Sequence, residues 1–104
     1  MLLQGKSALI TGAARGIGAA LAKGLAIAGA DIVVAELPGQ EEKKSEVKKT
    51  IELLGRRCEF VEIDVTNKSS VEAAIVDATN KMGKIDILVN NAGILIPSLL
   101  TDID

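Results

Sequence analysis

The stretch Thr11-Gly12-Ala13-Ala14-Arg15-Gly16-Ile17-Gly18 decides the fold of this chain. It follows a short apolar run, typical of a buried strand, and precedes apolar residues at helical spacing. Glycines between a strand and a helix permit a tight turn and let backbone N–H groups approach a pyrophosphate. The helix that begins there directs its positive end toward the same phosphates. The spacing is G-x-x-x-G-x-G rather than the commoner G-x-G-x-x-G, and such glycines can also serve helix packing alone.

Strand and helix patterns alternate along the rest of the chain. We expect strands over residues 7–11, 31–36, 59–64 and 85–90. We expect helices over residues 16–28, 41–54 and 68–82, ended by Gly29, Gly55 and Gly83. Four strands alternating with three helices predict an α/β fold with a doubly wound parallel sheet of Rossmann type, three layers and strand order 3-2-1-4.

The periodic apolar residues predict which side of each helix packs on the sheet. For the first helix they are Ile17, Leu21, Leu25 and Ala28. For the second they are Val47, Ile51 and Leu54, opposite a charged run over residues 41–49 that is typical of a solvated face. For the third they are Val71, Ala74, Ile75, Ala78 and Met82, with Asn67 as the expected N-cap.

Composition narrows the possible function classes. The chain has 104 residues, 48 % of them hydrophobic and 25 % charged, as expected of one globular domain over residues 1–104. A net charge of −2 gives no basic surface for nucleic acid, and no apolar run approaches the ~20 residues of a membrane span. The sequence contains no His, and Cys58 is its only cysteine, so we expect no metal site and no internal disulfide. With no room for a signal peptide before the first strand, we expect a cytoplasmic protein.

An acid at the end of the second predicted strand suggests a nucleoside ligand. The carboxylate of Glu36 stands where it can accept hydrogen bonds from ribose hydroxyls. It would also repel a 2′-phosphate, and the following Leu37 adds no positive charge, which favours NAD over NADP. Arg15 favours the opposite choice, because a guanidinium in the glycine loop can reach that phosphate, or it can pair with Glu36.

Two further segments end strands on the same edge of the predicted sheet. Asp64-Val65 follows the third strand, where an acid can bond the adenine amino group or simply begin the next helix. Asn90-Asn91-Ala92-Gly93 ends the fourth strand, beside the first. Ligands of doubly wound sheets bind outside the carboxyl ends of the strands, and all these segments belong to that edge.

Taken together, these segments resemble the short-chain dehydrogenase/reductase family in order and spacing, over essentially the whole chain. The resemblance implies an NAD(P)-dependent oxidoreductase, usually dimeric or tetrameric, that transfers a hydride between the cofactor and an alcohol or ketone. It assigns the pyrophosphate side to Gly12, Arg15, Gly16, Ile17 and Gly18. It assigns the adenosine ribose to Glu36 and Leu37, and the adenine to Asp64 and Val65. It places Asn91, Ala92 and Gly93 along the cofactor toward the nicotinamide, while Thr11 and Asn90 join the central strands.

The family's catalytic Ser, Tyr, Lys and Asn would all lie beyond Asp104, and the sequence contains no Tyr. We therefore expect the catalytic half to be missing and this chain to be inactive alone. The alternative is a non-catalytic dinucleotide-binding module. An S-adenosylmethionine methyltransferase shares the glycine loop and the strand-two acid but does not predict Asn90-Asn91-Ala92-Gly93, and a P-loop NTPase lacks its Gly-Lys-Ser/Thr.

The predicted order places Ile87-Leu88-Val89 at an open edge of the sheet. This segment is apolar and contains neither Lys nor Pro to block pairing with another strand. We therefore expect the chain to form homo-oligomers, to aggregate, or to require a partner that supplies further strands.

Overall fold

The computed structural model describes residues 2–14 and 16–91, and the predicted element order is confirmed over them. The strands are β1 (Ser7–Thr11), β2 (Asp31–Glu36), β3 (Cys58–Glu62) and β4 (Ile87–Asn90). The helices are α1 (Gly16–Ile27), α2 (Glu41–Leu53) and α3 (Lys68–Met82).

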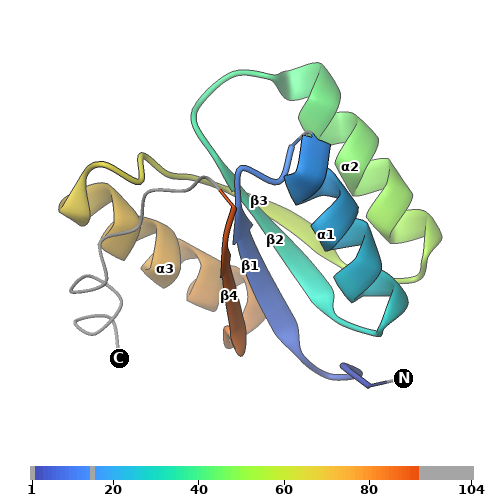
Figure 1. Cartoon of the computed structure of the whole chain (residues 1–104). Coiled ribbons are helices and arrows are strands. Elements are labelled where there is room, and N and C mark those ends of the chain that lie inside the picture. The colour runs from blue at the N-terminus through green and yellow to red at the C-terminus, as the bar shows by residue number, and fades with distance from the viewer. Residues whose placement is uncertain (1, 15, 92–104) are drawn as a thin grey trace.

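The strands form a parallel sheet with the predicted order β3-β2-β1-β4. Helices α1 and α2 cover one face of it and α3 covers the other, so the chain folds in three layers (Figure 1). Each strand-to-strand connection crosses over through a helix, as a parallel pair requires. All strands therefore end at the same edge, where the loops after β1 and β2 meet.

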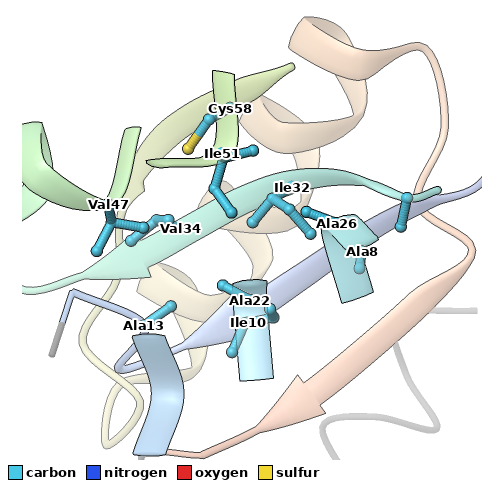
Figure 2. Close-up of a cluster of buried hydrophobic side chains, with 11 residues drawn as sticks. Ala8, Ile10, Ala13, Ala22, Ala26, Ile32, Val34, Val47, Ile51 and Cys58 are labelled. Carbon is cyan, nitrogen blue, oxygen red and sulfur yellow. The ribbon is translucent and has the colours of Figure 1, made fainter. Parts of the chain in front are cut away.

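Each face of the sheet has its own hydrophobic core, because neighbouring residues of a strand point to opposite faces. On the α1 and α2 face, Ala8 and Ile10 of β1 and Ile32 and Val34 of β2 pack against small helix residues and the long side chain of Ile51 (Figure 2). On the α3 face, Leu9 and Val33 pack against Val71 and its neighbours along the helix. β1 is buried along its whole length between these layers.

The predicted packing face of α1 is only partly confirmed: Leu25 packs against the core and Ala28 is half-buried, but Ile17 and Leu21 are exposed. The buried residues of this helix are Gly18, Ala22 and Ala26, whereas Ile17 and Leu21 are 75 % and 40 % exposed. Small residues let the helix lie close to β1 and β2, and that closeness turns the larger side chains outward. The spacing of apolar residues along the helix reports its hydrophobicity, but it does not report how close the helix lies to the sheet.

The other helix predictions hold more closely. In α2, Val47 and Ile51 are buried as expected, but Leu54 lies beyond the helix end and is 39 % exposed. In α3, the predicted stripe is buried, with Ile75 only partly so. Asn67 caps this helix by accepting a hydrogen bond from the Ser70 N–H at 3.0 Å.

Two strands are shorter than predicted. β3 ends at Glu62 rather than Asp64, where the chain turns toward α3, and the Asp64 N–H donates to Ser70 Oγ of that helix at 2.8 Å. β4 begins at Ile87 rather than Ile85. Ahead of it, the Asp86 carboxylate accepts a hydrogen bond from the Ser7 N–H at 2.8 Å, so a side chain makes the contact that a strand residue would make.

Candidate functional site

The glycine loop between β1 and α1 adopts the turn that its sequence predicts. Gly12 has φ +68° and Gly16 has φ +58°, a backbone region that side chains disfavour. The Gly12 N–H donates to the Ala35 carbonyl at 2.9 Å, which ties the start of the loop to the end of β2. Ala13 and Ala14 are buried beneath it. The loop thus lies at the carboxyl edge of the sheet, before the first turn of α1.

Glu36 ends β2 directly beside this loop. Its Oε2 accepts a hydrogen bond from the Ala14 N–H at 3.2 Å, and the side chain is half-buried. The carboxylate therefore holds the position that the sequence predicted for a ribose-binding acid, and it also restrains the glycine loop.

A cleft of about 240 Å³ opens at this edge. It is lined by Gly12, Ala35, Glu36, Leu37, Ile63, Asp64, Val65 and Thr66. Five of the predicted cofactor-binding residues thus meet in one cleft: Gly12, Glu36, Leu37, Asp64 and Val65. They come from the ends of three strands that are distant in the sequence, as expected of a parallel sheet.

Asp64 is held at the cleft by a local turn. Its Oδ1 accepts hydrogen bonds from the N–H of Thr66 at 3.0 Å and from its hydroxyl at 2.6 Å. The side-chain bond chiefly, and then the backbone bond, lower the pKa of Asp64 below its usual value. The carboxylate is therefore anionic at neutral pH and suited to accept a hydrogen bond from a ligand amino group. Thr66 was not among the predicted site residues, although Asp-x-Thr after a strand is a recognisable turn signal.

The predicted nicotinamide-side residue Asn91 braces the glycine loop. Its Nδ2 donates to the Gly12 carbonyl at 3.1 Å. On the same side, the Thr11 hydroxyl donates to Asn90 Oδ1 at 3.3 Å, which confirms that these two residues join the central strands. The loop is therefore held from both neighbouring strands, by Glu36 at Ala14 and by Asn91 at Gly12.

Gly18 packs against this brace. A Cβ at Gly18 would overlap the Gly12 carbonyl oxygen and stand 2.5 Å from Asn91 Nδ2 and 2.9 Å from the Ala13 Cα. The third glycine of the loop thus permits close packing between α1 and the loop. Ile17, by contrast, is exposed on the first turn of the helix. Arg15, Ala92 and Gly93 lie outside the described residues.

Residues 2–14 and 16–91 contain no group of His, Cys, Asp and Glu placed to hold a metal ion. None of their helices combines the length and the apolar character needed to cross a membrane. Two larger hollows, of about 380 and 670 Å³, lie between α1 and α2 and along β3, and neither is lined by Glu36 or Asp64.

The residues present fit a dinucleotide. The loop exposes backbone at the start of a helix, which suits phosphate groups. It can do so because Gly12 and Gly16 adopt positive φ angles and Gly18 packs tightly against the loop. The adjoining cleft offers the carboxylates of Glu36 and Asp64 to hydroxyl and amino groups, and apolar cover from Val65 and Leu37.

Comparison with known proteins identifies the family to which the chain is similar. A family model described as short chain dehydrogenase matches residues 6–104. The chain is 48 % identical over 89 residues to an L-2,3-butanediol dehydrogenase of Corynebacterium glutamicum, covering 86 % of this chain and 34 % of that protein. It is 47 % identical over 94 residues to the oxidoreductase UcpA of Escherichia coli K12, covering 88 % and 34 %.

A solved structure agrees with the fold. A short chain dehydrogenase from Burkholderia cenocepacia J2315 in complex with NADP superposes with a TM-score of 0.83 at 45 % identity, covering 90 % of this chain and 38 % of that one. The chain thus spans about a third of the length of the curated relatives it matches. With the matched family model, the identities and the strand order in agreement, the chain belongs to the short chain dehydrogenase family.

Proposed function

We propose that this chain is the dinucleotide-binding part of an NAD(P)-dependent oxidoreductase that interconverts alcohols and ketones. The observation that carries the proposal is the cleft that joins the glycine loop to Glu36 and Asp64. When bound, the nicotinamide group would supply the hydride chemistry, while the protein supplies position and electrostatics. The butanediol dehydrogenase relative supports this reaction class, and the UcpA relative supports an oxidoreductase.

Each part of the site has a proposed role. Backbone N–H groups of the glycine loop, with Gly12, Arg15, Gly16, Ile17 and Gly18, would hold the pyrophosphate. Glu36 and Leu37 would hold the adenosine ribose, and Asp64 and Val65 the adenine, as the lining of the cleft suggests. Asn91, Ala92 and Gly93 would lie along the cofactor toward the nicotinamide. The hydrogen bond between Asn91 and the Gly12 carbonyl supports a role in shaping the loop for this ligand.

We propose NAD as the preferred cofactor, because the Glu36 carboxylate at the ribose position would repel a 2′-phosphate. The Burkholderia relative is in complex with NADP, so the comparison with solved structures does not favour NAD. Calorimetric titration with both cofactors tests the preference. NAD(H) should bind about ten- to a hundredfold more tightly than NADP(H), the value of one charge-assisted interaction. Glu36→Ala should narrow that gap.

Glu62 provides the matched control for this titration, since it lies beside Glu36 in the β2–β3 register and is exposed. Glu62→Ala should leave the ratio of the two affinities unchanged. Equal or tighter binding of NADP(H) by the unmodified chain would contradict the proposal and assign Arg15 to the 2′-phosphate.

The alternative function is a non-catalytic dinucleotide-binding module. Both functions require cofactor binding, and they differ only in turnover. We expect this chain to bind NAD(H) but to show no oxidation of alcohols and no reduction of ketones from neutral to alkaline pH, because it contains no Tyr to move the proton. Turnover that persists after repurification to constant specific activity would show that another group serves as proton donor.

We propose a cytoplasmic protein that functions as a homo-oligomer. Fractionation of cells that produce the protein, followed by sedimentation of the purified material, tests both.

A further inference from the structure

The strand β3 lies at one edge of the sheet and directs part of its backbone away from it. The Arg57 carbonyl accepts from the Ile32 N–H at 2.9 Å, and the Ile63 N–H donates to the Glu36 carbonyl at 2.9 Å, so odd-numbered positions face β2. Backbone groups of a strand alternate in direction, and the N–H and C=O of Phe60 and Glu62 therefore point outward. Such an edge can template pairing with another strand.

A lysine of α3 forms a hydrogen bond with one of these outward backbone groups. Lys81 Nζ donates to the Phe60 carbonyl at 2.7 Å, a short distance that indicates a charge-assisted hydrogen bond. Asp77, one turn earlier on α3, holds the same ammonium at 3.4 Å. The C-terminal end of the helix is itself tied to the start of β3, because Arg57 donates to the Lys81 carbonyl at 2.8 Å.

A surface hollow lies beside this contact. A hollow of about 670 Å³ runs along β3, bounded by Phe60 and Glu62 of the strand, by Glu41 and Lys44 of α2, and by Asp77 and Lys81 of α3. Its charges have both signs, and they do not single out one class of charged ligand. The chemistry that the edge offers is backbone hydrogen bonding, which a strand from a second copy of this chain would satisfy.

We propose that Lys81 latches a strand-pairing edge: its ammonium keeps the outward backbone of β3 from pairing with β3 of a second copy. The Lys81 ammonium places a positive charge at the edge of the sheet. It also occupies the Phe60 carbonyl, which could otherwise accept a hydrogen bond from an incoming strand. Replacing Lys81 by a side chain of similar length without donors, Lys81→Met, should therefore permit edge-to-edge association. Lys81→Arg, which retains charge and donors, should remain as the unmodified chain.

Sedimentation velocity over a range of concentrations measures the effect. We expect the association constant of Lys81→Met to rise about tenfold or more, the factor expected for one lost charge-assisted hydrogen bond. Lys84→Met is the matched control, because it removes the same charge from a lysine that pairs with Asp86 beside β4, at 3.2 Å. An equal rise in Lys84→Met would reduce the effect to net charge and overturn the proposal.

A second substitution tests whether β3 is the strand that pairs. Glu62→Pro removes an outward N–H while leaving the bonds to β2, so the double variant Lys81→Met with Glu62→Pro should return to the association of the unmodified chain. Amide exchange at Phe60 and Glu62 should slow in Lys81→Met as the dimer forms. Association that survives Glu62→Pro, or no increase in well-folded Lys81→Met, would overturn the proposal.

Discussion

The central strand β1 has two neighbours that are attached to it in different ways. On the β2 side, both strands are buried and the contact is made by apolar side chains on both faces. On the β4 side, residues alternate between half-buried and exposed, and polar side chains make specific contacts with β1. Asp86 accepts from the Ser7 N–H at its start, and Asn91 donates to the Gly12 carbonyl at its end.

The two sides of β1 therefore have different roles: apolar packing against β2 stabilises the sheet, whereas polar contacts on the β4 side position the candidate site. Buried apolar area contributes about 25 cal/mol per Å², so the β2 side carries most of the stability. A hydrogen bond contributes only about 1 kcal/mol net but is directional, and polar contacts on the β4 side therefore set register and loop geometry. The glycine loop lies between the two attachments, joined to Glu36 on one side and to Asn91 on the other.

The largest effect is expected at Gly18, where both attachments meet. Gly18→Ala places a Cβ against Gly12, Ala13 and Asn91, and should lower the free energy of unfolding by about 3 kcal/mol or more and abolish NAD(H) binding. Gly24→Ala is the control on the same helix, since a Cβ there meets nothing within 4 Å. It should stabilise the protein by about 0.5–1 kcal/mol. Urea denaturation measures both, and equal responses would show that α1 does not press on the loop.

Matched truncations on the two sides come next. Ile51 is completely buried on the β2 side, and Ile51→Ala should cost about 3 kcal/mol through lost burial and a cavity. Leu88 of β4 is 36 % exposed, and Leu88→Ala should cost less than about 1 kcal/mol. Similar losses in denaturation experiments would mean that β4 is as well packed as β2, and the comparison would fail.

Asn91→Ala tests the directional contact by itself. Removal of Nδ2 leaves the half-buried Gly12 carbonyl without this donor and should cost about 1 kcal/mol of stability. Because the loop would lose its brace, NAD(H) should also bind more weakly than this stability loss alone would cause under conditions where both proteins are fully folded. Calorimetry that shows unchanged affinity would make Asn91 a purely structural residue.

The pH dependence of stability offers a finer test of the β4 side. The Ser7 N–H, chiefly, lowers the pKa of Asp86 below its usual value, and Lys84 adds to the effect. A lowered folded-state pKa stabilises the protein above the unfolded pKa of about 4, and this contribution disappears as the pH falls through the folded value. Asp86→Asn should therefore lose less stability than the unmodified chain on acidification. Because the pKa of Asp64 is also lowered, the comparison should be repeated in an Asp64→Asn background.

Thiol labelling gives the smallest and most local readout. Burial raises the pKa of Cys58 to about 12, so its thiol should react only when the β2 side unfolds. A thiol introduced by Leu88→Cys should be labelled much faster without global unfolding. Equal labelling rates for the two thiols would show that both sides open together.

Element order, strand order and the position of the cleft followed from local pattern. Hydrophobic period distinguishes strand from helix, and right-handed crossovers leave few arrangements of parallel strands. Once β1 and β2 are parallel, Gly12 and Glu36 must end at the same edge of the sheet, and Asp64 joins them for the same reason. Hence five residues of the cleft were predictable although they come from segments that are far apart in the sequence, namely Gly12, Glu36, Leu37, Asp64 and Val65.

Tertiary structure decided the contacts that depend on distance between elements. The fully buried residues of α1 are Gly18 and two alanines rather than Ile17 and Leu21, because the helix lies close to the sheet at these positions. The Asn91 brace and the Lys81 contact with β3 join elements whose separation no periodicity encodes. A pattern in one segment reports which face is apolar, whereas close packing and side-chain hydrogen bonds depend on where the neighbouring segment stands.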